Sequence, residues 1–196
     1  MATTDSRTAG VLPPLSTEGA LAPEDAIRQW VSQITGIPIT LVRKRWLAKP
    51  GTKPALSQDW CAVGVEKIRT HGTPYQRGKK GIISDPESGD VKRESHQTLH
   101  CIASFYGPSA AELSDLFRES SQIGQNADAL AASGMVVQGV DDDIVHLPDF
   151  FHEQWVDRYD VSFRLGRKVV HTFGVRDLAK IGDLEIYTEK REGLNA

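Results

Sequence analysis

One stretch of the sequence alternates between apolar and polar residues, and it constrains the fold more than any other. It runs from Glu153 to Leu165, and its apolar face carries Tyr159, Val161, Phe163 and Leu165. The opposite face carries Arg158, Asp160, Ser162 and Arg164. Because successive side chains of a strand point to opposite faces, one face is predicted to be buried and the other wet. This pattern is typical of antiparallel sheets, since parallel strands covered on both faces are continuously apolar.

Further strands are predicted on both sides of this stretch. The segment from Val91 to Tyr106 also alternates, and its apolar face carries Leu99, Cys101, Ala103 and Phe105. Shorter candidates are Leu41 to Trp46, Trp60 to Ile68, Met135 to Val140, Arg167 to Phe173 and Leu184 to Thr188.

Helices are predicted in three places. Pro23 with two following carboxylates suits a first helical turn, and Gly36 ends the helical spacing of apolar residues. A second helix is predicted from Ser109 to Ile123, with an apolar stripe of Ala110, Leu113, Leu116, Phe117 and Ile123. A short third helix is predicted from Asn126 to Ala132, before Gly134.

These elements predict a single α+β domain. The length of 196 residues suits one domain, and we expect a mostly antiparallel β-sheet with two or three helices packed on it over residues 23–190. Residues 1–22 are rich in Ala, Thr, Ser, Gly and Pro without a sustained period, so they are expected to form a flexible N-terminal arm. Residues 191–196 are expected to form a flexible C-terminal tail.

The net charge of −3 conceals two blocks of opposite sign. From Arg43 to Arg93 there are 12 Lys/Arg and 5 Asp/Glu, whereas from Glu94 to Phe163 there are 2 Lys/Arg and 12 Asp/Glu. Such blocks can provide a basic surface for nucleic acid, or complementary patches that meet head to tail between identical subunits. The third interpretation is that the two blocks interleave in space and are simply solvated.

Two segments are candidate contact loops. The stretch 71–90 is rich in glycine and proline and is predicted to be a long loop or a hairpin tip, with Arg77, Lys79 and Lys80 as its contact residues. The second is an acidic turn and loop over 141–152, which begins with Asp141, Asp142 and Asp143. Loops of this length are more often functional than mere connections.

Several kinds of active site are disfavoured by the motifs. The chain lacks a phosphate-binding Gly-rich motif, a Gly-x-Ser-x-Gly elbow and clustered zinc ligands. A metal-dependent nuclease site built on the acidic run is also disfavoured, because the position two after Glu153 holds Trp155 and not lysine. Cys61 and Cys101 are predicted to be buried thiols on neighbouring strands. We therefore expect no catalysis, no cofactor and no metal.

No apolar run approaches the roughly 20 residues that a membrane helix needs. The N-terminus also lacks a basic patch followed by an apolar stretch, so no signal peptide is expected. These observations predict a cytoplasmic place of synthesis and no membrane association.

The order and spacing of several segments resemble the neck terminator, or tail terminator, family of tailed bacteriophages. The segments that carry the resemblance are AIRQWVSQITGIP (26–38), LVRKRW (41–46), DWCAVGV (59–65), CIASFYGP (101–108), QNADALAASGM (125–135), EQWVDRYDVSFRLGRKV (153–169) and TFGVRDL (172–178). Together they span roughly residues 24–188, which is nearly the whole predicted domain.

The resemblance implies a structural virion protein that assembles in the host cytoplasm. It implies a homo-oligomeric ring, commonly a hexamer, that caps the tail tube, ends tube polymerisation and joins the tail to the head-side connector. The implied partners are the tail tube protein, the connector or neck protein and, in a contractile tail, the sheath protein. DNA would pass through the ring without sequence-specific binding.

Two alternatives to a terminator remain open on the sequence alone. The first is a nucleic-acid-binding or nucleic-acid-processing accessory protein that uses the basic residues of 67–93 to grip phosphates. The second is a head-side connector or stopper ring of the same neck.

Overall fold

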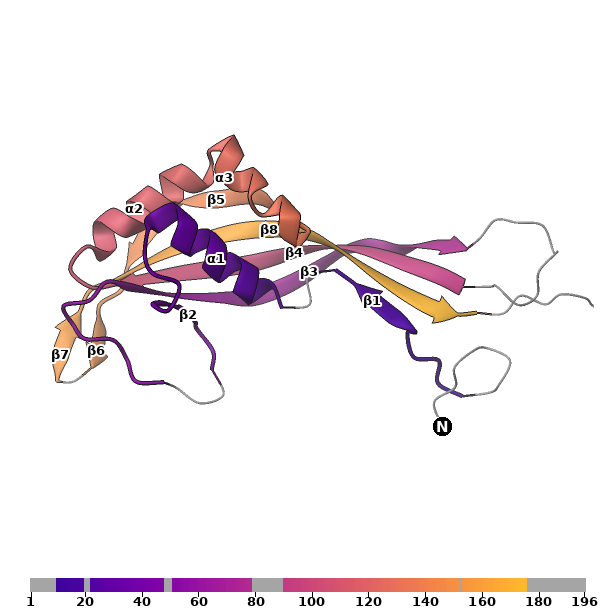
Figure 1. Ribbon diagram of the computed structural model, residues 1–196, viewed down its shortest axis with the longest axis horizontal. Helices are drawn as coiled ribbons and strands as arrows, with labels where there is room; N and C mark the ends of the chain where they lie inside the picture. The colour runs from indigo at the N-terminus through magenta and orange to yellow at the C-terminus, as the bar shows by residue number, and fades with distance from the viewer. Residues whose placement is uncertain (1–9, 20–21, 48–50, 79–89, 152, 176–196) are drawn as a thin grey trace, which may run out of the picture.

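Three long antiparallel strands form the centre of the fold in the computed structural model (Figure 1). They are β3 (Trp60–Gly78), β4 (Asp90–Tyr106) and β8 (Arg158–Gly174), with β4 in the middle. The structure describes residues 10–19, 22–47, 51–78, 90–151 and 153–175, and for 73–78, 90 and 151 it describes the backbone only. None of the helices in these described ranges is long and apolar enough to cross a membrane.

Shorter strands line the two edges of this sheet. β2 (Val42–Lys44) pairs with β3 and makes the parallel contact of the sheet. On the other edge, β5 (Met135–His146) and β1 (Ser16–Glu18) pair with successive parts of β8. β6 (Asp149–Phe151) and β7 (Gln154–Val156) form a separate hairpin. The mostly antiparallel α+β prediction is confirmed.

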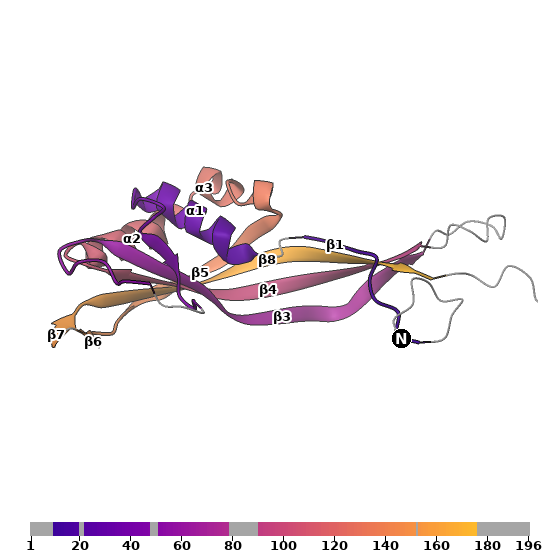
Figure 2. The same ribbon diagram turned by 60° about the horizontal axis from the view of Figure 1, so that its bottom comes forward.

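All the helices lie on one face of the sheet (Figure 2). They are α1 (Pro23–Thr35), α2 (Ala110–Ser121), α3 (Gly124–Asp128) and a 3₁₀ turn, η1 (Ala131–Ser133). α1 begins at Pro23 and ends at Gly36, whose φ of 74° is accessible to glycine at little cost, as the sequence predicted. Gly107 makes the turn from β4 to α2 with φ of 110°, and a Cβ there would lie 2.7 Å from the Cα of Asp59.

The core fills the space between the helices and the sheet. The predicted apolar faces of β4 and β8 are confirmed, since Leu99, Cys101, Ala103, Phe105, Val161, Phe163 and Leu165 are all buried. Phe117 of α2 lies at the centre, with its ring 5.3 Å from that of Trp30 and 5.5 Å from that of Phe163. Trp30 is held in place by a hydrogen bond of 2.7 Å from its Nε1 to the carbonyl of Asn126. These aromatic contacts join α1 and α2 to both central strands.

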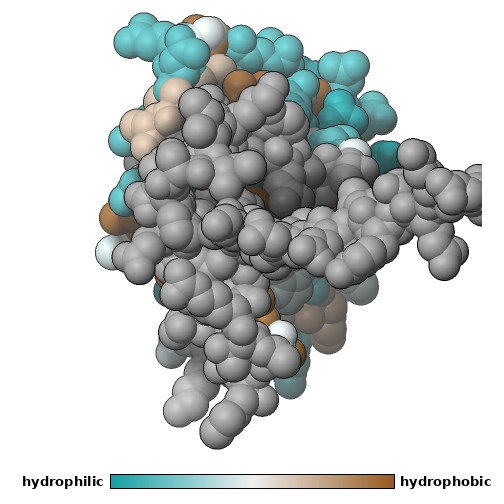
Figure 3. Space-filling view, turned by 90° about the vertical axis from the view of Figure 1, so that its right-hand side faces the viewer, coloured by the Kyte–Doolittle hydropathy of each residue, from teal (hydrophilic) through white to brown (hydrophobic). Residues whose placement is uncertain are grey.

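The strands extend well beyond the helices (Figures 1 and 2). The 17 residues of β8 span about 55 Å, whereas the 13 residues of α1 span about 20 Å. In the view from the end where β3 and β4 meet undescribed residues, the described surface shows brown apolar spots among teal polar ones (Figure 3). Because the strands are longer than the helices, one half of the sheet is covered by helices and forms a layered domain. The other half, the strand extension, consists of strands without a helix layer.

Several predicted boundaries are corrected by the structure. The stretch 71–78, predicted as part of a loop or hairpin tip, belongs to β3, so it is one arm of a hairpin. The region 153–173 divides differently from the prediction, because β7 ends at Val156 and β8 then continues without a break to Gly174. β1 falls inside the segment predicted to be an arm. The predicted strand 184–188 and the tail 191–196 lie outside the described residues.

Two of the residues assigned to the apolar stripe of α2 are exposed. Leu116 is 44% exposed and Ile123 is 56% exposed, whereas the neighbouring Phe117 is fully buried. Leu116 is exposed because a helix can press only part of its circumference against one sheet, and Ile123 is exposed beyond the end of α2 at Ser121.

We expect Phe117→Ala to lower the free energy of unfolding by about 3–5 kcal/mol, because it removes a fully buried aromatic ring and leaves a cavity. The matched control is Leu116→Ala, which truncates the adjacent exposed side chain and should change stability by about 0.5 kcal/mol or less. Urea unfolding followed by tryptophan fluorescence measures both. Equal losses for the two variants would contradict this description of the core.

Candidate interaction surfaces

The acidic run lies within the edge strand β5, which corrects the predicted turn and loop over 141–152. The register of β5 against β8 shifts between Val140 and Ile144, so Asp141, Asp142 and Asp143 form a bulge. All three are exposed. A guanidinium nitrogen of Arg164 lies 3.8 Å from the Asp141 carboxylate. The three carboxylates are thus presented along the outer edge of the sheet.

Of the predicted basic contact residues, Arg77 alone falls within the described residues. Arg77 belongs to β3, where its backbone pairs with Lys92 of β4, while Lys79 and Lys80 lie outside the described residues. Lys67 and Arg69, which precede them on β3, are exposed. β4 and β8 lie between β3, which carries Lys67, Arg69 and Arg77, and the acidic bulge of β5, so these described basic residues are apart from the bulge within one copy.

The two thiols are buried on neighbouring strands, as predicted. Cys61 lies on β3 and Cys101 on β4, and both are free. Burial raises the pKa of the Cys61 thiol well above its ordinary value. Burial also raises the pKa of the Cys101 thiol, to about 12. Both thiols are therefore protonated at neutral pH. Since the thiolate is the reactive form, they act as packing groups and not as nucleophiles.

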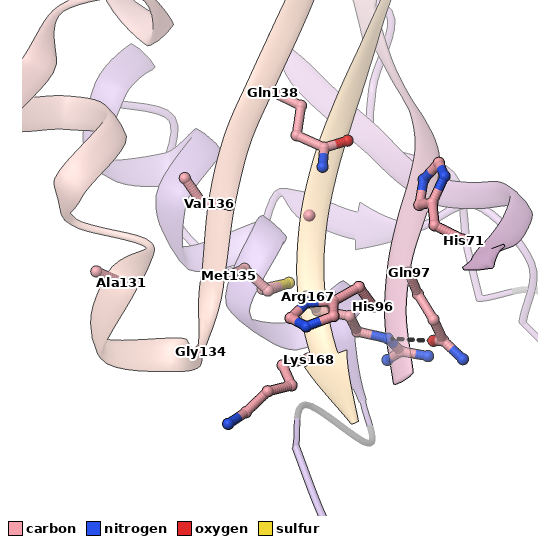
Figure 4. Close-up of a pocket in the computed structure, with 11 residues that line it drawn as sticks. His71, His96, Gln97, Ala131, Gly134, Met135, Val136, Gln138, Arg167 and Lys168 are labelled. Carbon is pink, nitrogen blue, oxygen red and sulfur yellow. Dashed lines mark hydrogen bonds between the residues drawn. The ribbon is translucent and has the colours of Figure 1, made fainter. Parts of the chain in front are cut away.

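A row of polar side chains crosses the sheet on the face away from the helices, and Figure 4 shows its two ends, Gln138 and His71. Thr98 of β4 donates a hydrogen bond of 2.7 Å to Gln138 of β5, and its oxygen lies 2.6 Å from Nε2 of His71 on β3. Gly166 of β8 makes this possible, because a Cβ there would lie 2.6 Å from the Gln138 amide nitrogen. On the opposite face of the sheet, Arg167 donates a hydrogen bond of 2.9 Å to Gln97, since both side chains point to the same side as Leu99 and Leu165. The row joins β5, β4 and β3 across β8 and borders an open depression of about 350 Å³.

A second cluster on the same face holds the base of the β6–β7 hairpin. The rings of Trp60 and Tyr106 stack 4.1 Å apart, and Val156 of β7 packs against them. Next to them Arg158 donates two hydrogen bonds, of 3.0 and 2.8 Å, to the buried carboxylate of Asp160. Asp160 was predicted to lie on a wet face, but it is 5% exposed, close to Tyr106 and hydrogen-bonded to Arg158.

The β6–β7 hairpin carries two exposed aromatic rings. Phe150 is 58% exposed and Trp155 is 73% exposed, and their centroids lie 5.2 Å apart. The hairpin projects from one end of the domain (Figures 1 and 2). From the sequence, β6 was expected within the loop 141–152 and β7 within the alternating stretch from Glu153 to Leu165, so the hairpin was not predicted. The available signal was the aromatic content of a short acidic segment between Asp149 and Asp157.

A basic groove lies on the opposite edge, between α1 and β2. Its lining consists of Asp25, Arg28, Arg43, Lys44, Leu47, Gly51 and Thr52, and its volume is about 540 Å³. Lys44 forms an ion pair of 2.8 Å with Asp25, and its hydrogen bond and charge hold the pKa of that carboxyl below its usual value. Arg28 donates a hydrogen bond of 2.6 Å to the carbonyl of Val42. The groove is therefore a fixed, net positive surface with an apolar side.

The described residues contain no group of three or more His, Cys, Asp or Glu side chains placed to hold a metal ion. His96 and His100 both lie on β4, so their spacing of four residues is that of a strand and not of a helical ligand pair. The surfaces described above can bind through shape, charge and apolar contact.

Comparison with known families gives one match. A family model described as "Phage neck terminator protein" matches residues 24–192 of the chain. The matched range begins in the first turn of α1 and includes every later helix and strand of the structure, while β1 precedes it. No curated protein matches the chain.

The buried thiols make stability depend on alkaline pH in a defined direction. The unfolded chain releases its thiol protons near pH 9, whereas the folded chain retains the proton of Cys101 until about pH 12. Ionisation then favours the unfolded state, so the stability contributed by the protonated thiol is present below pH 9 and is lost between about pH 9 and 12.

We expect the stability of the wild type to fall relative to Cys101→Ala as the pH rises from 8 to 11, by up to about 1.4 kcal/mol per pH unit. Urea unfolding of both proteins at each pH measures this difference, and the comparison cancels tyrosine and lysine titrations that the two share. A difference that stays constant with pH would show that the thiol ionises as easily in the folded protein as in the unfolded one.

Proposed function

The chain belongs to the phage neck terminator family, and from this premise we propose that copies of it form a ring, with six members, that caps the tail tube. Its role is that of a structural protein of the phage neck, and hence of the virion. The observation that carries the proposal is the family match, which covers most of the chain. In this proposal the protein acts by assembly and carries out no catalytic step.

The arrangement of the sheet supports a ring. A ring contact is heterologous, so each subunit must offer two different surfaces that complement each other. β2 and β5 lie on opposite edges of the sheet and differ in charge, because β2 carries Arg43 and Lys44 whereas β5 carries three aspartates. Two unlike edges on one rigid sheet suit repeated head-to-tail contact.

Termination follows from the geometry of such a ring. One ring face binds the last tube ring, and the other face presents a surface that tube subunits do not recognise, so tube growth ends. The second face then binds the head-side connector, and DNA passes through the channel without sequence-specific contacts. The strand extension of β3, β4 and β8 gives each subunit the reach to contact a neighbouring ring, and Arg77, Lys79 and Lys80 are proposed to contact a partner there.

We expect a phage with an early stop codon in this gene to produce filled heads beside unattached tails of irregular, excessive length. Without a terminator nothing stops tube polymerisation and nothing joins the tail to the head. Electron microscopy of lysates measures this, and supplying the intact protein from a plasmid should restore joined virions. Ordinary virions in the mutant lysate would overturn the proposal, and leaking heads beside normal tails would indicate a head-side stopper.

Binding to short duplex DNA tests the accessory-protein alternative. The basic residues of β3 and β4 would give phosphate contacts whose affinity falls steeply with salt. We expect binding of the purified protein to vanish well below physiological salt, as measured by fluorescence anisotropy in a salt series. Binding that persists at physiological salt would favour a nucleic-acid-binding function.

A further inference from the structure

The β6–β7 hairpin has the composition of a docking element. Trp155 and Phe150 expose most of their rings at its surface, and large aromatic side chains are the residues that contribute most to protein–protein binding. Acidic residues accompany them, since Asp149, Glu153 and Asp157 lie within or beside the hairpin. Its base is fixed by the packing of Val156 on the Trp60–Tyr106 pair. A partner surface that complements these aromatic rings and carboxylates is apolar and positively charged.

The groove between α1 and β2 has the complementary properties. It contains three cationic side chains and one carboxylate, and Leu47 at its side is 47% exposed. Trp46, beside Leu47, is 58% exposed and rests over Gly64, where any Cβ would collide with the indole ring. The volume of about 540 Å³ lies in the range of sites that accept a bulky side chain.

The two surfaces lie on different faces of one copy, and the β2 and β5 edges are aligned across the sheet. The hairpin connects β5 to β8, and its base packs on Trp60 of β3 and Tyr106 of β4 on the face away from the helices, whereas the groove lies between α1 and β2. One row of paired residues crosses the sheet between these edges: Arg43, Ala62, Ser104, Asp160 and Val145. β2 and β5 run antiparallel, as the successive pairings require. A neighbour placed beside the sheet thus brings its β5 side to the β2 edge at the level of the groove.

We propose that the β6–β7 hairpin of one copy inserts Phe150 and Trp155 into the basic groove between α1 and β2 of a second copy. The proposal rests on the ring proposed above and identifies its subunit contact. Arg43 and Lys44 face the hairpin carboxylates, and the acidic bulge of Asp141 to Asp143 extends the contact along the edge of the sheet. Because the two surfaces differ, each copy uses its hairpin toward one neighbour and its groove toward the other.

Cysteine cross-linking in assembled particles tests the contact. The stop-codon phage is complemented with the full chain carrying Leu47→Cys and Trp155→Cys together, and purified particles are treated with a short bis-maleimide. Head-to-tail contact yields a ladder that continues beyond the dimer on a denaturing gel. Each single variant is the matched control and should give monomer, because its one introduced thiol has no partner at the contact and Cys61 and Cys101 are buried. Particles whose double variant stays monomeric would overturn the proposal.

Charge exchange covers the case in which the cysteine variants do not assemble. We expect Arg43→Glu and Glu153→Arg each to lower the yield of complemented phage by about tenfold or more, and the two together to restore part of it, because opposite charges again face each other. Lys67→Glu, on the exposed part of β3, is the control for the same change of charge elsewhere. Absence of rescue with folded proteins would indicate a tube or connector protein as the occupant of the groove.

These outcomes separate the contact from the proposed function. If the stop-codon phage lacks the long, unattached tails, the terminator role is wrong, and the contact loses its premise. If the tails are long and complementation succeeds, but neither the ladder nor the rescue is observed, the terminator role stands and the hairpin contact is wrong.

Discussion

The packing of α1 and α2 against one face of the three long strands is the interaction on which the rest of the structure depends. Phe117 lies between the rings of Trp30, Phe105 and Phe163, so a single side chain links both helices to β4 and β8. This packing buries one face at one half of the sheet. The same strands then continue beyond the helices, held by the backbone pairing of β3, β4 and β8.

A protein built in this way has surfaces that a single copy cannot cover. The helices protect one face, but both edges of the sheet end in short strands, and the hairpin presents Phe150 and Trp155 to solvent. Open strand edges and exposed aromatic rings tend to associate, so proteins keep them where association is useful. Membership of a family of neck proteins gives this exposure a reason, since such a protein works by contact with other proteins.

Periodicity accounts for the parts of the fold that could be predicted. The alternation along β4 and β8 identified the core residues because their pairing is regular there, and Gly36 marked the end of α1. Prediction failed where a local pattern is interrupted. The bulge at Asp141 to Asp143 places three acidic residues inside a strand, and Asp160 is buried because Arg158 pairs with it. The first case follows from a change of register, and the second from side-chain packing between strands, neither of which a local period encodes.

The sequence by itself determined the class of the fold, its core strands, its first helix and the family, because these depend on local spacing and on the order of segments along the chain. Tertiary structure alone decided which surfaces face outward. The opposite placement of the β2 and β5 edges arises from strand order, whereas the basic groove arises from the packing of α1 beside β2 and the aromatic pair from the pairing of β6 with β7. Strand order brings together or separates residues that are far apart in sequence, and no period within one segment encodes it.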